Sequence, residues 1–202
     1  MKTIFLVRHG ETLANREGIL QGWSNNPLDD TGEKQASALV TRASRVPLAA
    51  IYTSDLIRTQ QTAAPLAEAR GIKPVVLPGL REVSFGKWDG HPMREIQEKD
   101  PETLRDLFLK PTRVQLDAEE NLFASQKRGW ETFTKLVENM EPDTNILCVS
   151  HGGLIRLLVC SLLDIPIDNM WKLSLYNTAF VQVVETKKFG YRVDKVNDMG
   201  LL

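Results

Sequence analysis

Short apolar runs alternate along this chain with segments whose apolar residues recur at helical spacing. Apolar runs bounded by turn residues predict strands, and here they lie at residues 3–7, 49–53, 74–77 and 145–150. The segments between them predict helices at 31–43, 56–69 and 154–159. Gly71 is placed to end the second helix as a C-cap. The third segment is nearly all apolar, so we expect its helix to be buried.

The end of the chain predicts an antiparallel hairpin, with strands at 179–185 and 191–196 and a turn near Lys188 and Gly190. Because strands and helices alternate before this hairpin, we expect an α/β fold with a mainly parallel sheet covered by helices on both faces. The length of 202 residues and the apolar fraction of 42% favour one domain, residues 1–202, with a single substantial core.

Residues 83–127 interrupt the alternation of strands and helices. The segment contains prolines, aromatic residues and nearly balanced charge. It is either a plain loop-and-helix excursion or a helical lid over one end of the sheet, and its position directly after Glu82, a candidate acid, favours the lid. Its aromatic residues Phe85, Trp88 and Phe123 suggest an apolar pocket, with packing of the lid onto the sheet as an equal alternative.

The composition narrows the classes of partner. A net charge of −1 gives no overall positive field for nucleic acid or an anionic membrane, so any anion must be bound by a few placed cations. Cys148 and Cys160 lie in apolar runs and are expected to be reduced core residues, not a disulfide or metal site. The apolar start, residues 4–7, is too short for a signal segment, and no run reaches membrane-spanning length. We therefore expect a cytoplasmic protein.

Two histidines stand where predicted strands end. His9, in the sequence LVRHGET, and His151, in SHGG, each follow an apolar run and precede a glycine. Ligands of open α/β sheets bind at the carboxyl ends of strands, so the two imidazoles can converge on one substrate. A lone histidine beside a strand is more often structural, and the neighbouring residues decide between the two interpretations.

The residues around His9 favour an anion site. Arg8 offers a guanidinium fork suited to phosphate oxygens, and Gly10 allows the backbone to approach closely. Asn15 and Gln21 add neutral donors. Imidazole is a competent nucleophile toward phosphorus when its other nitrogen is oriented by a hydrogen bond. The cluster is therefore typical of an anion site that contains a nucleophile.

Arg58 lies in the predicted first turn of the helix at 56–69, which Ser54 or Asp55 would cap. A solvated arginine on a helix face is the commoner interpretation. Cations, however, are disfavoured near a helix N-terminus, where anions bind, so Arg58 indicates an anionic partner. Glu82, taken alone, is an ordinary surface carboxylate.

Four segments occur in an order that covers nearly the whole chain: RHGET at 8–12 with Asn15, the run Pro27-Leu28-Asp29-Asp30-Thr31-Gly32, SDLIRT at 54–59 with Gln61 and Thr62, and SHGG at 150–153. Together they resemble the histidine phosphatase superfamily, whose members have a phosphoglycerate mutase-like fold. Arg-His-Gly alone is a modest signal. The blocks around Arg58 and His151 at compatible spacing make it a strong one.

The resemblance implies that His9 attacks phosphorus and becomes phosphohistidine, while Glu82 protonates the leaving oxygen and then helps to activate water. The groups that would hold the phosphoryl oxygens are Arg8, Arg58, Asn15 and His151. Further contacts with phosphate or substrate are expected from Gln21, Gly22, Gly152 and Glu120. Phosphoryl transfer demands alignment and stabilisation of charge. Two arginines and two histidines can supply both without a metal, so we expect no cofactor.

The segment around the candidate acid, EVSFGKWDG at 82–90, resembles the phosphatase branch of the superfamily, including broad-specificity and α-ribazole phosphatases. A mutase must hold a bisphosphorylated intermediate, which favours extra cations in the lid, yet residues 83–128 hold eight Lys or Arg against nine Asp or Glu. We therefore expect a phosphomonoester hydrolase of small phosphorylated metabolites. The alternatives are a cofactor-dependent phosphoglycerate mutase and a non-catalytic module that binds phosphorylated ligands.

One segment departs from the phosphatase pattern. Where those phosphatases often carry PGGES, residues 116–121 read LDAEEN, which keeps a carboxylate at Glu120 and replaces the serine with Asn121. This segment is expected to border the leaving-group pocket, so the physiological substrate does not follow from the sequence. The apolar helix and the terminal hairpin could each be core or interface, which leaves a homodimer open.

Overall fold

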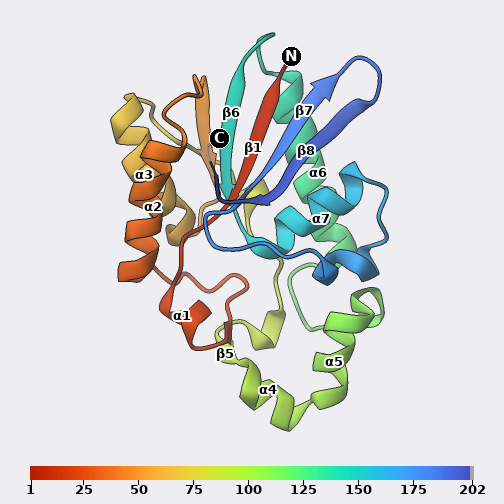
Figure 1. The fold of residues 1–202 in the computed structure, drawn as a ribbon. Helices are drawn as coiled ribbons and strands as arrows, with labels where there is room; N and C mark the ends of the chain where they lie inside the picture. The colour runs from red at the N-terminus through yellow and green to blue at the C-terminus, as the bar shows by residue number, and fades with distance from the viewer. Residues whose placement is uncertain (201–202) are drawn as a thin grey trace.

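A six-stranded sheet forms the centre of the computed structural model, which describes residues 1–200 (Figure 1). Its strands are β1 (Thr3–Arg8), β3 (Ala50–Thr53), β4 (Val75–Val76), β6 (Asn145–Ser150), β7 (Phe180–Thr186) and β8 (Gly190–Asp198). They lie in the order β4-β3-β6-β1-β7-β8, in which the first four are parallel and the hairpin β7-β8 is antiparallel. The predicted α/β fold with its mainly parallel sheet and C-terminal hairpin is confirmed.

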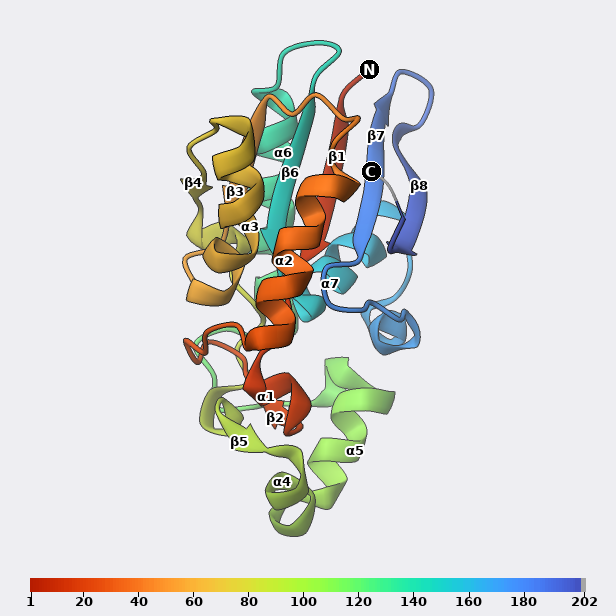
Figure 2. The ribbon, with the colours of Figure 1, turned by 60° about the vertical axis from the view of Figure 1, so that its left-hand side comes forward.

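Helices cover both faces of the sheet, as Figures 1 and 2 show. On one face lie α2 (Asp30–Arg42) and α3 (Ile57–Arg70), and on the other α6 (Leu122–Glu138) and α7 (Gly152–Leu162). Successive residues of a strand point to opposite faces, so Leu6 packs into the core beneath α6 and α7 while Phe5 and Val7 pack toward α2 and α3. Burial on both faces explains why β1 and β6 are continuous apolar runs.

Of the two predicted ends of α3, the structure confirms the C-terminal one and corrects the N-terminal one. Gly71 ends α3 with φ +62°, which confirms the predicted C-cap. The expectation that Ser54 or Asp55 caps α3 is wrong, because the N-cap residue is Leu56, whose side chain cannot cap, and the N–H of Ile57 donates to Oδ1 of Asn25 at 2.7 Å. Asp55 pairs instead with Arg81, and the Ser54 hydroxyl lies 2.7 Å from a ring nitrogen of His151.

A group of short elements lies beyond the carboxyl ends of the parallel strands (Figure 2). It comprises α1 (Leu13–Arg16), α4 (Met93–Lys99), α5 (Pro101–Leu109) and the two-stranded sheet of β2 (Ile19–Leu20) and β5 (His91–Pro92). The remaining single-turn and 3-10 helices are η1 (Pro78–Leu80), η2 (Gly86–Trp88), η3 (Pro111–Arg113) and η4 (Ile167–Lys172). Because α6 begins at Leu122, the last residues of the segment expected as a lid, 83–127, belong to a helix of the main layer.

A separate apolar core joins several of these short elements to α7. Phe85 and Trp88 are buried in it, whereas Phe123 is 56% exposed and does not belong to this core. Cys148 and Cys160 are free and buried, as expected. No helix within residues 1–200 is long and apolar enough to cross a membrane.

The loop after β1 lies directly on the first turn of α2. A Cβ atom at Gly32 would lie 2.0 Å from the carbonyl oxygen of Glu11, and one at Gly10 would lie 2.8 Å from the carbonyl oxygen of Gly32. Both obstacles are backbone atoms, which cannot move aside as a flexible side chain can. The two glycines therefore set how closely the His9 loop approaches α2.

We expect Gly32→Ala to lower the free energy of unfolding by about 1–3 kcal/mol because of this overpacking. The direction of this change is informative, because replacing glycine with alanine inside a helix ordinarily raises the free energy of unfolding by about 0.5–1 kcal/mol. Urea unfolding measures the change, with Ser37→Ala on the exposed side of α2 as the matched control. An unchanged or raised stability of Gly32→Ala would contradict the close contact.

Candidate active site

The parallel pairing of β1 with β6 brings the two predicted histidines together. Arg8 is the register partner of Ser150, and the backbone N–H of His9 donates to the carbonyl of Ser150 at 3.0 Å. The imidazole rings of His9 and His151 consequently lie with their centroids 5.3 Å apart. Both side chains are buried.

A backbone carbonyl fixes the tautomer of His9. Its Nδ1 lies 2.7 Å from the carbonyl oxygen of Gly10, and because a carbonyl only accepts, Nδ1 carries the hydrogen. In the neutral ring Nε2 then has a free lone pair, and no residue of the described chain hydrogen-bonds to it. Burial lowers the pKa of His9 well below its usual value, and the positive charges of Arg58 and Arg8 lower it further. The ring is thus a neutral base with its outer nitrogen open.

A chain of hydroxyl groups orients His151. Thr59 Oγ1 lies 2.8 Å from the carbonyl oxygen of Leu56, so its hydrogen is donated to a carbonyl. The Ser54 hydroxyl then donates to Thr59 Oγ1 at 2.9 Å and accepts from Nε2 of His151 at 2.7 Å. This leaves Nδ1 of His151 buried and without a partner within residues 1–200. Burial is the main cause that lowers the pKa of His151 well below normal, and the positive charge of Arg58 lowers it further. A bound anion would oppose both effects.

Carbonyl groups hold two cations of the site, the buried Arg58 and the partly buried Arg8. Arg8 Nη1 donates to the carbonyl of Leu175 at 2.7 Å, and Arg58 donates to those of Ser24 and Gly22 at 2.7 and 2.9 Å. The Nε atom of each is buried with no partner in the described chain. Burial is the main cause that lowers the pKa of each to about 10, so both remain charged at neutral pH.

Asn15 presents its amide nitrogen to the site because its oxygen is already engaged. Its Oδ1 accepts from the backbone N–H of Thr12 at 3.2 Å and from Nδ2 of Asn177 at 3.3 Å. Gln21 is nearly buried and its Oε1 has no partner within residues 1–200. Gly22, at φ +47°, supplies one carbonyl that holds Arg58.

The carboxylate of Glu82 lies at the N-terminus of α7. Its Oε1 accepts from the backbone N–H groups of Val83 and Leu154, both at 2.9 Å, and its Oε2 accepts only from that of Gly153, at 3.1 Å. A Cβ at Gly153 would lie 2.6 Å from Oε1. The glycine therefore makes room for Glu82, and Oε2 keeps the freer position for a proton.

These side chains surround one cavity of about 320 Å³. Of the residues expected at the site, those that line it are Arg8, His9, Asn15, Gln21, Gly22, Arg58, Glu82 and Gly152. His151 does not line it but lies buried against His9. Within residues 1–200, no group of three or more His, Cys, Asp or Glu side chains could hold a metal ion.

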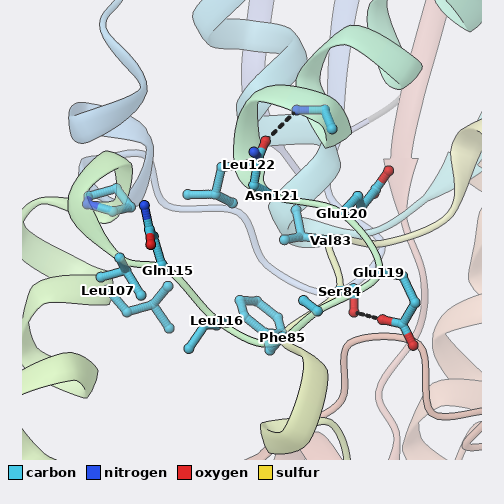
Figure 3. Close-up of a pocket in the computed structure, with 14 residues that line it drawn as sticks. Val83, Ser84, Phe85, Leu107, Gln115, Leu116, Glu119, Glu120, Asn121 and Leu122 are labelled. Carbon is cyan, nitrogen blue, oxygen red and sulfur yellow. Dashed lines mark hydrogen bonds between the residues drawn. The ribbon is translucent and has the colours of Figure 1, made fainter.

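Glu120 is not brought to this cavity. It forms an ion pair with Arg128, whose guanidinium also donates to the carbonyl of Glu82 at 3.1 Å. Glu120 instead lines a neighbouring cavity of about 520 Å³, shown in Figure 3, which shares Phe85 with the first. Its carboxylate acts on the site through Arg128, which holds the backbone around Glu82.

The cavity is also lined by residues that the sequence did not single out, among them Phe108, Trp171 and Arg156. Phe108 comes from α5 and Trp171 from η4, and neither segment carries a motif. Arg156 had a detectable signal, because it is the one charged residue in the apolar run 154–159. A cation within a buried helix implies a partner or a ligand.

The arrangement suits chemistry on an anion that carries an electrophilic centre. It combines an imidazole with an open nitrogen, two arginines whose Nε atoms have no partner in the described chain, and a carboxylate, all lining one cavity. Charges and donors that the fold holds in fixed positions stabilise developing negative charge without reorganising.

A family model described as the histidine phosphatase superfamily (branch 1) matches residues 4–199. The chain belongs to this superfamily and is a phosphatase of its branch 1. Phosphoserine phosphatase 1 of Hydrogenobacter thermophilus is 32% identical over 180 residues, which cover 89% of this chain and 85% of that protein. The adenosylcobalamin/alpha-ribazole phosphatase of Salmonella typhimurium is 31% identical over 175 residues, 83% of each chain. A probable phosphoglycerate mutase of Yersinia enterocolitica is 32% identical over 183 residues, 91% of this chain and 85% of that protein.

Solved structures agree with this membership. A mycobacterial glucosyl-3-phosphoglycerate phosphatase, in a complex with VO3, superposes with a TM-score of 0.89 at 28% identity, over 98% of this chain and 99% of that one. The relatives named as phosphatases act on small phosphorylated metabolites. The predicted family and the predicted class of enzyme are confirmed.

We expect the ring of His9 to stay neutral, with hydrogen on Nδ1, as the pH falls through 6.5, where a free imidazole takes up its second proton. Nitrogen NMR of the labelled imidazole measures this. Because Arg58 is a smaller cause of the lowered pKa than burial, Arg58→Met should raise the titration midpoint only part of the way to 6.5. A wild-type midpoint at or above 6.5, or hydrogen on Nε2 of the neutral ring, would refute the assigned tautomer and environment.

Proposed function

We propose that this protein hydrolyses monoesters of small phosphorylated metabolites through a phosphohistidine formed on Nε2 of His9. The observation that carries the proposal is the 2.7 Å contact of His9 Nδ1 with the carbonyl of Gly10, beside the buried Arg58 and the partly buried Arg8. The contact leaves Nε2 as the nucleophilic nitrogen, and the arginines attract the phosphoryl group to it.

In the first step, the Nε2 lone pair of His9 forms a bond to phosphorus while the bond from phosphorus to the ester oxygen breaks. Arg8, Arg58 and the amide nitrogen of Asn15 stabilise the equatorial oxygens, which carry most of the transition-state charge. His151 joins them once it gains a proton on Nδ1, because the phosphate dianion favours the charged ring.

Glu82 donates a proton in the first step and accepts one in the second. Its protonated Oε2 gives the hydrogen to the departing ester oxygen, which leaves as an alcohol. In the second step Glu82 takes a proton from water, whose oxygen attacks the phosphohistidine. The bond from phosphorus to Nε2 then breaks, His9 regains its lone pair, and inorganic phosphate is released. The proposal assigns no step to a metal ion.

Hydrolysis is favoured over phosphoryl exchange by the lid. The lid segment has no excess of Lys and Arg over Asp and Glu, so it offers few cations that could bind a bisphosphorylated intermediate. One named relative is nevertheless a probable mutase. An assay of 3-phosphoglycerate with and without 2,3-bisphosphoglycerate separates the two activities, since only a mutase isomerises it. The presence of His9, Arg58, Glu82 and His151 in one site argues against a module that merely binds.

We expect His9→Ala to abolish turnover of p-nitrophenyl phosphate and to lose the acid-labile phosphoenzyme in rapid-quench labelling. The control is His91→Ala, which removes an exposed histidine of the lid and should leave both signals intact. Labelling that persists on another residue in the His9 variant would overturn the assignment of the nucleophile.

Glu82→Gln should slow alkyl phosphates by about 100-fold or more while largely sparing p-nitrophenyl phosphate, because only a poor leaving group needs protonation. Rates on both substrates are compared with those of Glu98→Gln, which removes an exposed carboxylate of α4. A thermal melt checks that the amide, which places a donor near the N–H of Gly153, does not unfold the site. Equal losses on the two substrates would eliminate the acid role.

A further inference from the structure

Arg156 is a cation of the cavity that the proposed chemistry does not use. It projects from α7, its Nε donates to the carbonyl of Leu173 at 2.7 Å, and its guanidinium carbon lies 5.3 Å from the ring centre of Trp171. No acceptor within residues 1–200 hydrogen-bonds to its two terminal amino groups, and no carboxylate of that range forms an ion pair with it. The side chain is therefore held at its base with its donor edge free.

Arg156 lies next to the proposed phosphoryl site. A Cβ at Gly152 would lie 2.9 Å from Nη1 of Arg156 and 3.4 Å from Nε of Arg8, so the glycine lets both guanidinium groups approach. The two like charges interact unfavourably: after burial, Arg156 is the next cause that lowers the pKa of Arg8. Such a pair in a buried site is costly unless an anion joins it.

The charges of the cavity exceed what a phosphoryl group neutralises. Its charged lining consists of Arg8, Arg58 and Arg156 against Glu82 alone. When Glu82 is protonated to act as an acid and His151 is charged, the positive charges of the three arginines and His151 exceed the negative charge of a phosphate dianion. Arg156 is the cation to which the proposed chemistry assigns no anion, and a carboxylate on the leaving group would supply one.

The surroundings of Arg156 form a wall distinct from the strand ends. Phe108 of α5 and Trp171 of η4 pack with their ring centroids 5.4 Å apart, and both line the cavity. The indole N–H of Trp171 is buried without an acceptor in the described chain. A guanidinium against an aromatic ring keeps its planar edge available for a bidentate contact with a carboxylate.

We propose that Arg156 binds a carboxylate of the leaving group, so that the preferred substrates are phosphate monoesters of hydroxy acids. The inference rests on the proposed function, because it places the ester oxygen between His9 and Glu82. Arg156 selects among esters and takes no part in the bond changes at phosphorus. Its loss should therefore affect acidic and neutral esters unequally.

The test compares 3-phosphoglycerate with glycerol 3-phosphate, which differ only in a carboxylate against a hydroxymethyl group. The wild-type protein should prefer the acid by kcat/KM. Arg156→Gln should lower kcat/KM for 3-phosphoglycerate roughly 10- to 100-fold, as expected for a lost charge-assisted hydrogen bond, and alter that for glycerol 3-phosphate less than about threefold. Arg156→Lys keeps the positive charge but loses the bidentate guanidinium edge. Its kcat/KM for 3-phosphoglycerate should therefore lie between those of the wild type and Arg156→Gln. Arg94→Gln removes an exposed lid cation and controls for general electrostatic attraction.

Two outcomes overturn the inference: a wild-type protein that shows no preference for the acid, or an equal loss on both esters in Arg156→Gln. An equal loss on both esters would indicate that Arg156 contacts the transferring phosphoryl group and not the leaving group. If Arg156→Gln fails to fold, the wild-type preference and Arg156→Lys decide. Phosphoenzyme labelling at His9 separates this inference from the proposed function: labelling without acid preference contradicts only Arg156, and absent labelling contradicts the mechanism itself.

Discussion

The register between β1 and β6 is the constraint on which the site depends. Pairing of Arg8 with Ser150 ends both strands at the same level, so the two histidines that follow must meet. A slip of one residue would turn every side chain of a strand to the opposite face. Because both faces of these strands are buried beneath helices, such a slip would misplace apolar residues on either side. The core therefore enforces the geometry of the site.

The site also depends on how Arg58 is buried. Arg58 is fully buried, yet no carboxylate in residues 1–200 forms an ion pair with it; its partners are the carbonyls of Gly22 and Ser24. Carbonyl dipoles fix the guanidinium without cancelling its charge. A carboxylate in their place would neutralise the cation and leave nothing for an anion to bind. The fold thus keeps an unneutralised charge in a rigid position, which a solvated surface arginine could not provide.

The sequence predicted those features that local patterns determine: apolar runs located the strands, Gly71 located the end of α3, and motifs at strand ends located the two histidines. The cap of α3 was mistaken because Ser54 is engaged by a distant histidine, a contact that only the folded chain creates. Trp171 was missed because its position depends on how α5 packs against η4, and Glu120 was misplaced because Arg128 captures it. Motif spacing carries no information about a wall assembled by packing alone.

The cavity has two parts, the residues at the strand ends and the aromatic wall of Phe108 and Trp171, and this division affects how substrate choice can evolve. The residues at the strand ends are positioned by the two cores that pack on the sheet. Phe108 comes from α5, and Trp171 of η4 packs against the separate third core. Mutations in α5 or η4 can reshape the wall without disturbing His9 or its arginines. Selection can then change which molecules enter while the reactive centre is inherited intact, which is how one scaffold supplies many enzymes.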